Sequence, residues 1–407
     1  MKYQLTCCTC GHVTPDFGAW FAQNQTCPQC GSKHSEVHYE VDYTPLQHLY
    51  NQKADSFWHY FNYLPLMHRE NIVSLGEGAT PIEHWSYLER YAAERHDIHC
   101  NVLAYRNDLN GGTGTLKDPA ASLGASLFRE YGIKEYCLSS TGNTATAYAR
   151  YLAEAGVRFT NFAPFNISPD SVNEIQRLGQ HIEISEGDYG RAKQEATDYA
   201  ATHHVLITWG NFDPIRIEAK RTMAFEFIRL LGCMPDVYMQ AVAGGTGPIA
   251  LNKGVRELSE HLPNIHMPRM ILVQQDLCDP MVQGWETAVK TGFPEGYEEN
   301  YPKVDATRTS VSILTAGNPG MYPLVAPMVR RSGGTFVRVA ETDLPQVAAK
   351  VHQERGALIG PAAAVCVAGF YRALETGHIH QGDTVVVNIG ESCRRNTTFA
   401  AQVQALE

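Results

Sequence analysis

A lysine stands between a glycine-rich turn and the expected start of a helix, where an amine could do chemistry. Residues 109–128 read LNGGTGTLKDPAASLGASLF, with Asp118 and Pro119 after Lys117 at the positions of an N-cap and a first helical residue. A helix N-terminus disfavours an ammonium and lowers its pKa, as a nucleophilic lysine requires. Most lysines beside helix starts are solvated surface residues, so this segment alone is weak evidence for a catalytic Lys117.

A second turn brings hydroxyl and amide groups to the end of an expected strand. The stretch SSTGNTATAYARYLAEAG begins at Ser139, turns at Gly142 and continues as an alanine-rich helix. Open α/β sheets bind ligands at the carboxyl ends of their strands. The same side chains could simply cap the helix, although capping and ligand binding do not exclude each other. The candidate substrate-binding and cofactor-binding residues here are Ser140, Thr141, Gly142, Asn143 and Thr144.

A third turn, AVAGGTGPIA, consists of small residues between an expected strand and an expected helix. Small residues let backbone N–H groups approach a phosphate, and the helix dipole favours the anion. The turn lacks the lysine of a nucleotide P-loop and the GxGxxG spacing of a dinucleotide site. It therefore predicts a phosphate site without a nucleotide signature, formed by Gly244, Gly245, Thr246 and Gly247.

Four cysteines near the N-terminus form two CxxC pairs, each followed by a glycine. Each pair can turn two thiolates toward one ion, and the glycine permits the turn. Four thiolates complete a tetrahedral zinc site and leave no open position, so such a zinc would be structural. A redox pair and a disordered tag are the alternatives, and Cys8 is a competing ligand at the wrong spacing. The pattern is typical of a zinc ribbon, and we call residues 1–40 the ribbon. The predicted zinc ligands are Cys7, Cys10, Cys27 and Cys30.

From about residue 100 onward, short apolar runs alternate with helical patterns, as in α/β proteins. The predicted strands include residues 101–105, 135–139, 158–162, 181–184, 205–208, 237–242, 270–274 and 384–389. The predicted helices include residues 143–154, 214–231, 344–354 and 362–375. The alternation predicts open, twisted, mostly parallel sheets with helices on both faces.

Length and charge limit the class of protein. A chain of 407 residues predicts two domains and a small module, which we place at residues 1–40, 41–218 and 219–407. The formal net charge is −10 and no run of five or six like charges occurs, which argues against a nucleic-acid partner. No apolar run is long enough to cross a bilayer and the N-terminus does not read as a signal peptide, so we expect no membrane partner and a cytoplasmic location.

In these motifs the chain resembles the fold-type II pyridoxal phosphate (PLP) enzymes, which share the architecture of the tryptophan synthase β chain, and most closely the threonine synthases. Residues 56–66, 74–82 and 210–227 are also similar to family segments. The resemblance implies that Lys117 forms the Schiff base with PLP and that Asn143 bonds the ring hydroxyl. It implies that the turn from Gly244 to Gly247 holds the phosphate of PLP.

The resemblance weakens at three places. Pro119 stands where the family usually has an arginine, and residues 360–364 read GPAAA where relatives show an acidic residue before the proline. Residues 385–396 read VVVNIGESCRRN, which is closer to the cysteine synthase and cystathionine synthase ending. In that ending a serine contacts the pyridine nitrogen, which makes Ser392 the candidate here. Glu391 is the alternative, and Ser392 could also be a solvated loop serine.

The implied activity is elimination or replacement on a small amino-acid substrate. A threonine synthase-like lyase acting on O-phosphohomoserine comes first, a β-replacement synthase acting on an activated serine second, and an amino-acid dehydratase third. A catalytically inactive binding or regulatory homologue is the alternative from another class. A substrate phosphate would need cations, and Arg106, Lys220 and Arg221 lie near the motifs in sequence. The resemblance also implies a homodimer.

Overall fold

A small antiparallel sheet begins the chain in the computed structural model, which describes residues 2–306 and 309–406. Its strands have the order β2-β1-β3 and are β1 (Tyr3–Cys7), β2 (Val13–Thr14) and β3 (Ser35–Tyr39). The helix α1 (Phe17–Ala22) follows β2, and the Asp16 side chain accepts a hydrogen bond from the Ala19 N–H at 2.8 Å. Trp20 and Phe21 are buried, and the Phe21 ring meets Phe128 of the body edge-on. The ribbon therefore shares a core with the rest of the chain.

The second sheet has four parallel strands in the order β8-β7-β6-β9. The strands are β6 (Glu135–Ser139), β7 (Arg158–Ala163), β8 (His181–Ile184) and β9 (Leu206–Ile207), and the helices around them are α3 (Asp118–Glu130), α4 (Asn143–Ala155), α5 (Pro169–Arg177) and α6 (Tyr189–His203). Because side chains alternate along a strand, Tyr136 and Leu138 pack with α3 and α4, and Cys137 packs with α6 on the opposite face.

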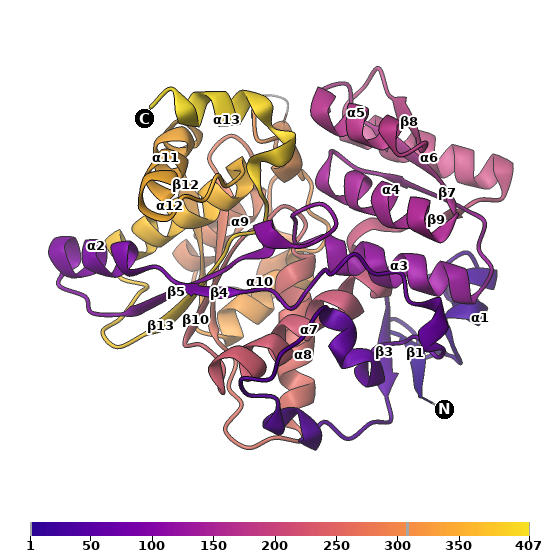
Figure 1. The fold of residues 1–407 in the computed structure, drawn as a ribbon, viewed down its shortest axis with the longest axis horizontal. Helices are drawn as coiled ribbons and strands as arrows, with labels where there is room; N and C mark the ends of the chain where they lie inside the picture. Colours follow the sequence, from indigo (N-terminus) through magenta and orange to yellow (C-terminus); the bar gives the residue numbers. More distant parts are fainter. Residues whose placement is uncertain (1, 307–308, 407) are drawn as a thin grey trace.

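The third sheet has six strands in the order β12-β11-β10-β13-β5-β4, all parallel except β4. The strands are β4 (Ile82–His84), β5 (Asn101–Tyr105), β10 (Val237–Ala241), β11 (Arg269–Gln275), β12 (Thr335–Val339) and β13 (Thr384–Asn388). One face packs against α2 (Ser86–His96), α11 (Leu344–Arg355), α12 (Pro361–Glu375) and α13 (Thr397–Gln404). The other packs against α7 (Pro214–Leu231), α8 (Thr246–Ser259), α9 (Pro280–Lys290) and α10 (Tyr322–Arg331). Figure 1 shows these two layers of helices.

Short 3-10 helices lie in the connections. They are Thr44–His48, Phe57–Tyr63, Arg69–Asn71, Asn107–Leu109, Gly210–Phe212, Tyr297–Glu299, Ser312–Leu314, Glu341–Asp343 and Cys393–Arg395. None of the helices in the described part of the chain is long and apolar enough to cross a membrane.

The predicted fold class, two open and mostly parallel sheets with a small N-terminal ribbon, is confirmed. The sheets, however, do not divide the chain at residue 218. The strands β4 and β5 come early in the sequence but lie in the six-stranded sheet, where β5 pairs with β13. The reason is that β5 has a hydrogen-bonded neighbour at both edges, β4 on one side and the late strand β13 on the other. Where the domains divide therefore stays a prediction.

Candidate active site

The sites predicted around Lys117, Asn143 and Gly245 meet at one cavity of about 490 Å³. It lies at the carboxyl ends of β6, β10 and β13, since the residues that follow each of these strands line it. This is where open α/β sheets bind their ligands. The predicted residues that line the cavity are Lys117, Ser140, Thr141, Asn143, Thr144, Gly244, Gly245, Thr246 and Gly247.

Lys117 caps the N-terminus of α3, which begins at Asp118, so the helix starts with Asp118 as its first residue and not as its cap. Its amine forms no ion pair with any residue of ranges 2–306 and 309–406. Burial and the neighbouring Arg216 guanidinium lower the pKa of Lys117 to about 8, while Glu391 opposes the shift. A neutral amine is therefore accessible near physiological pH, as a nucleophile and base requires.

The buried Asp118 holds the glycine-rich turn in front of Lys117. Its carboxylate accepts hydrogen bonds from the Thr113 N–H at 2.9 Å, the Thr113 hydroxyl at 2.6 Å and the Thr115 N–H at 3.0 Å. If Asp118 were the N-cap of α3, its carboxylate would accept hydrogen bonds from N–H groups in the first turn of the helix. Instead it fixes the loop that presents the lysine.

The TGNT turn opens α4 with Asn143 as its first residue. The Ser140 hydroxyl oxygen accepts hydrogen bonds from the N–H groups of Gly142 and Ala145, at 3.2 and 3.3 Å. Ser140 thus both caps the turn and lines the cavity. Gly142 itself is not among the lining residues, and an added Cβ there would lie 3.2 Å from Cγ2 of Ile313, which does line the cavity.

The glycine turn forms a cradle at the start of α8. An added Cβ at Gly244 would lie 1.8 Å from the Asn211 side chain, and one at Gly247 would lie 2.2 Å from Gln240. Gly245 has φ +86°, in the left-handed region that favours glycine. The Thr246 hydroxyl donates to the Asn211 side-chain oxygen at 2.6 Å. Backbone N–H groups at a helix N-terminus, with no side chains in the way, suit a phosphate.

At the end of β13 the cavity is lined by Glu391 and not by Ser392. Asn143 donates its side-chain N–H to the Glu391 carboxylate at 2.5 Å, and the Ala362 N–H donates to the same group at 2.7 Å. Burial raises the pKa of Glu391. The Ser392 hydroxyl is buried toward Gly114, where an added Cβ would lie 2.9 Å away. Successive extended residues point to opposite sides, so only one of the two can face the cavity.

Cations dominate the cavity wall. Within the described residues one carboxylate lines it, that of Glu391. Burial lowers the pKa of Lys220 well below its ordinary value, with Lys117 and Arg216 adding to the effect. The lining cations are Lys33, Lys117, Lys193, Arg216 and Lys220.

Arg216 is the functional candidate that the sequence analysis missed. It lies one turn into α7, is 8 % exposed, and its nearest carboxylate, that of Asp213, is 3.8 Å away. Its Nε and one terminal nitrogen have no hydrogen-bond partner among the described residues. A buried guanidinium with unused donors is costly unless an anion completes it. The sequence PIR, residues 214–216, indicates a helix start, but nothing in it shows that the side of the helix that carries Arg216 would lie at the cavity.

Two of the three cations named from the sequence have structural roles instead. Arg106 pairs with Asp108 at 2.7 Å and with Glu83, and Arg221 pairs with Glu218 at 2.6 Å. Both are buried in these pairs and neither lines the cavity. Lys220 does line it.

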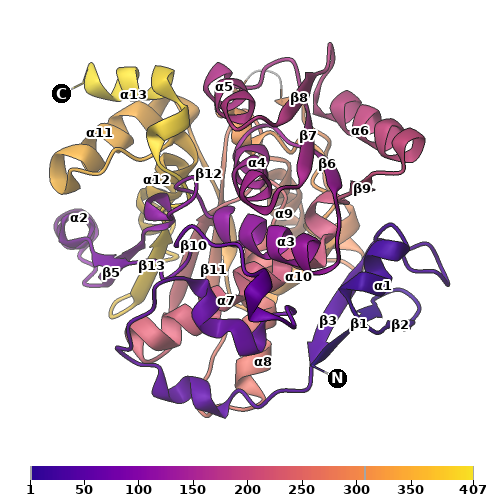
Figure 2. The ribbon, with the colours of Figure 1, turned by 45° about the vertical axis from the view of Figure 1, so that its right-hand side comes forward.

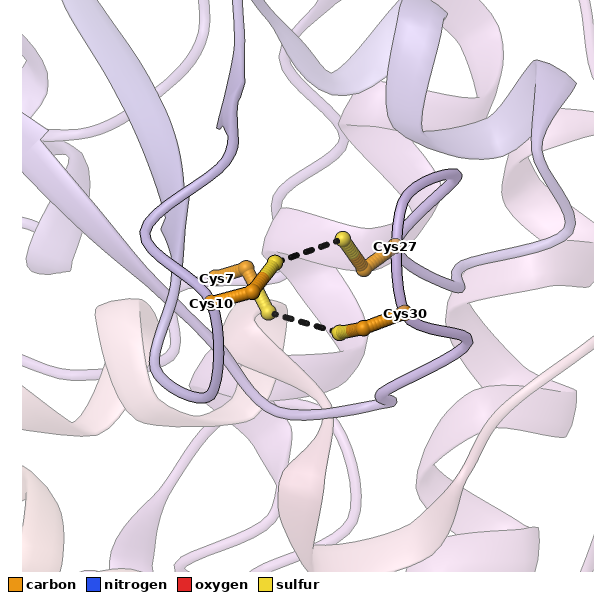
Figure 3. A group of neighbouring side chains, drawn as sticks. All are labelled: Cys7, Cys10, Cys27 and Cys30. Atoms are coloured by element: carbon orange, nitrogen blue, oxygen red, sulfur yellow. Dashed lines mark hydrogen bonds between the residues drawn. The ribbon is translucent and has the colours of Figure 1, made fainter.

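The four predicted cysteine ligands lie together in the ribbon, with all Sγ atoms within 4.8 Å of one another. Figure 3 shows the two CxxC turns, or knuckles, facing each other. The Sγ atoms of Cys7 and Cys30 lie 3.6 Å apart, as do those of Cys10 and Cys27. Gly11 and Gly31 take positive φ values after the knuckles, as predicted. The geometry and the donor set fit a tetrahedral thiolate site. Cys8 is exposed and lies outside the cluster.

Comparison with known proteins agrees with this geometry. Residues 73–390 match the family described as "Pyridoxal-phosphate dependent enzyme". A threonine synthase of Methanosarcina acetivorans is 26 % identical over 392 residues, covering 94 % of this chain and 90 % of that protein. A threonine synthase of Methanocaldococcus jannaschii is 25 % identical over 331 residues, covering 81 % and 78 %.

A solved L-serine ammonia-lyase from Rhizomucor miehei has the same fold, with a TM-score of 0.65 and 14 % identity over 82 % of this chain and 99 % of that one. At this identity the likeness concerns the fold alone. The lysine, the TGNT turn and the glycine cradle lie inside the matched segment, around one cavity. The chain therefore belongs to the family of pyridoxal-phosphate dependent enzymes, has the fold-type II architecture and resembles the threonine synthases.

Proposed function

We propose that the protein is a PLP-dependent lyase that acts on a phosphorylated amino acid, with O-phosphohomoserine as the first candidate and threonine and phosphate as products. The observation that carries this proposal is the composition of the cavity wall, which holds five basic side chains and one carboxylate. The phosphate of PLP accounts for one anion near the glycine cradle. Arg216, with two nitrogens that lack partners, calls for a second anion.

The residues present fit the cofactor. Lys117 would hold it covalently, the backbone from Gly244 to Gly247 with Thr246 would bind its phosphate, and Asn143 would meet its ring. Bound PLP supplies an electron sink for the carbanion at the substrate's α-carbon. Asn143 is held in place by its hydrogen bond to Glu391, so its orientation is fixed before any ligand enters.

The Lys117 amine can take a proton from the substrate carbon and return it, because its lowered pKa leaves a neutral fraction at physiological pH. The N-terminus of α4, with the hydroxyls of Ser140, Thr141 and Thr144, offers donors for the substrate's carboxylate. Arg216 and Lys220 would hold the phosphate and stabilise its charge as it leaves.

A β-replacement synthase acting on a serine activated by an anionic group is the second candidate. The same cations would bind that anion, and the ending of β13 resembles the cysteine and cystathionine synthases. An amino-acid dehydratase comes third, since it needs no second anion and would leave Arg216 unexplained. An inactive binding homologue is disfavoured by the lysine, the asparagine and the glycine cradle, which lie around one cavity.

We also propose that the four-cysteine cluster holds a structural zinc. Four thiolates leave no open position on the ion, so it would stabilise the ribbon and take no part in the reaction. The homodimer and the cytoplasmic location stay predictions from the resemblance and from the sequence.

The test is the visible absorption spectrum of the purified protein, before and after O-phosphohomoserine, with phosphate and threonine measured alongside. We expect a PLP chromophore that changes as both products accumulate, and neither chromophore nor turnover in Lys117→Ala. A wild-type chromophore unaffected by this substrate, but altered by O-phosphoserine with a sulfur nucleophile, would shift the proposal to β-replacement. A protein that stays colourless with added PLP would refute the enzyme proposal.

A further inference from the structure

The zinc ribbon reaches the active cavity. Lys33, three residues after Cys30, is one of the lining residues, and its Nζ lies 3.4 Å from the centre of the Trp209 ring. Trp209 lines the same cavity. In Figure 2 the ribbon lies at the side of the molecule next to β9, the strand that leads into Trp209.

The knuckle that carries Lys33 is held at both ends. Within the ribbon, the Cys27 N–H donates to the Ser32 carbonyl at 2.8 Å and the Cys8 N–H donates to the His34 carbonyl at 3.0 Å. The His34 ring packs against Phe212 at 5.4 Å between centroids. The backbone on both sides of Lys33 is therefore fixed, although the side chain itself is exposed.

Further contacts join the ribbon to the same wall. Gln25 donates a side-chain hydrogen bond to the Ile207 carbonyl at 2.6 Å, and Trp209 donates its indole N–H to the Asn24 carbonyl at 3.2 Å. The wall continues directly to Asn211, which accepts the Thr246 hydrogen bond, and to Arg216. The ribbon thus contacts the segment that carries Asn211, beside the glycine cradle, and continues to Arg216.

Lys33 has no anionic partner, since its ammonium forms no ion pair with any residue in ranges 2–306 and 309–406. Lys193, exposed on α6, also lines the cavity, and its Nζ lies 4.3 Å from the centre of the Tyr189 ring. Arg216 and Lys220 are buried further in. The cations therefore extend from the exposed rim of the cavity to its buried wall.

We propose that Lys33 is a substrate-recognition residue, through which the ribbon supplies a cation that draws in and holds the anionic group of the substrate. This rests on the proposed function, in which the substrate carries a phosphate. An exposed cation at a rim raises the association rate and makes binding sensitive to salt. The ribbon is then a wall of the active site.

The experiment compares Lys33→Met with the wild-type holoenzyme. Methionine keeps an apolar chain against Trp209 and removes only the charge. Lys134→Met is the matched control, because Lys134 is exposed and does not line the cavity. Lys33→Arg keeps the cation and should behave as the wild type. Inorganic phosphate is the probe, titrated into each holoenzyme by calorimetry at two salt concentrations.

We expect about a fivefold higher Kd for phosphate in Lys33→Met, which is the size that a partly exposed ion pair contributes, and a weaker dependence on salt. The KM for O-phosphohomoserine should rise by a similar factor with kcat unchanged. Lys134→Met should match the wild type in each measurement.

A phosphate Kd and salt dependence in Lys33→Met equal to those of the wild type would overturn the assignment of Lys33, even if the enzyme makes threonine. If the wild type binds phosphate but does not convert O-phosphohomoserine, the proposed substrate is wrong, and the phosphate titrations still decide the role of Lys33. A wild-type holoenzyme that binds no phosphate would overturn both proposals.

Discussion

At the scale of single residues, the cavity concentrates positive charge in a chain whose formal net charge is −10. Burial lowers the pKa of Lys117 and of Lys220, Arg216 adds to the effect on both, and Lys117 adds to the effect on Lys220. Such a cluster is stable only when anions compensate it or when an amine loses its proton. The lowered pKa of Lys117 is the second solution, and the phosphates of the proposed cofactor and substrate would be the first.

We predict that Arg216→Gln raises the KM for O-phosphohomoserine at least tenfold, because a charge-assisted hydrogen bond to a buried guanidinium contributes about 1.5–3 kcal/mol. The PLP chromophore should persist, since Arg216 is not part of the cradle. Steady-state kinetics and the visible spectrum check both points. Arg158→Gln, which removes a 79 % exposed guanidinium, is the control and should leave the kinetics unchanged. An unchanged KM in Arg216→Gln would exclude Arg216 from substrate binding.

The pKa of Lys117 predicts the pH dependence of cofactor loading. Only the neutral amine attacks PLP, and its fraction rises as the pH passes upward through about 8. We expect the rate at which colour appears after PLP is added to the apoenzyme to be half-maximal near that pH. In Arg216→Gln the midpoint should move upward, because a neighbouring positive charge is removed. A midpoint above pH 10 in the wild type would show that the lysine is not perturbed.

Residue types, spacing and the family resemblance were sufficient to single out the lysine, the asparagine and the glycine cradle, which the structure places around one cavity, and the four cysteines, which it places in one cluster. They were insufficient for Arg216 and for the choice between Glu391 and Ser392. A charged side chain on a helix usually faces water, and only the packing of α7 shows that this one does not. Whether Glu391 or Ser392 faces the cavity depends on the direction of two successive side chains after β13. A shift of the alignment by one residue exchanges the two.

At the scale of elements, the phosphate cradle depends on how α8 begins. Gly245 is the cap of this helix with φ +86°, and an added Cβ would lie 2.6 Å from Val325 Cγ2 of α10. A side chain at Gly245 is therefore disfavoured both by the left-handed backbone conformation and by the contact with Val325. The turn can adopt this shape because three of its four residues are glycine.

We predict that Gly245→Ala weakens PLP binding about tenfold or more, because a left-handed alanine costs roughly 1–2 kcal/mol and its methyl group must displace Val325. The Kd for PLP, measured by absorbance, checks this. Gly377→Ala is the matched control: Gly377 has φ +71° with no atom within 4 Å of an added Cβ, so the same backbone cost arises away from the cavity. Equal loss of PLP affinity in both variants would mean that general destabilisation is the cause.

Most strands were predictable, and β5, β6 and β8 have the predicted bounds. β5 and β6 are largely buried, as expected of parallel strands that read as short apolar runs, whereas β8 is an exposed edge strand. The predicted strand at residues 205–208 is reduced to Leu206–Ile207, because β9 pairs on one side only, with β6. The order of the strands was not predictable. Pairing between β5 and β13 leaves no local signal in either segment.

At the scale of the whole molecule, the ribbon is joined to the elements around the four-stranded sheet through a shared apolar core. Phe17, Trp20 and Phe21 belong to the same buried cluster as Phe128 and Tyr136. Loss of the metal would therefore loosen more than the first forty residues.

We predict that the wild type holds one zinc per chain. Cys30→Ser removes one thiolate from the cluster and should lose zinc and lower the melting temperature by about 5 °C. Cys8→Ser is the matched control, since Cys8 lies outside the cluster, and should keep both the metal and the melting temperature. Metal analysis and thermal unfolding followed by fluorescence give the two readouts. Full zinc content in Cys30→Ser would rule out a four-thiolate site.

The position of β13 between β10 and β5 has a consequence for how the chain is made. A ribosome delivers β5 (Asn101–Tyr105) long before β13 (Thr384–Asn388), the strand that lies beside it in the sheet. The four-stranded sheet, complete by Ile207, can assemble on the nascent chain, whereas the six-stranded one cannot be completed until β13 has been made. Until then β5 exposes an unpaired apolar edge, so slow or truncated synthesis should favour aggregation and make chaperones important for the yield of folded enzyme.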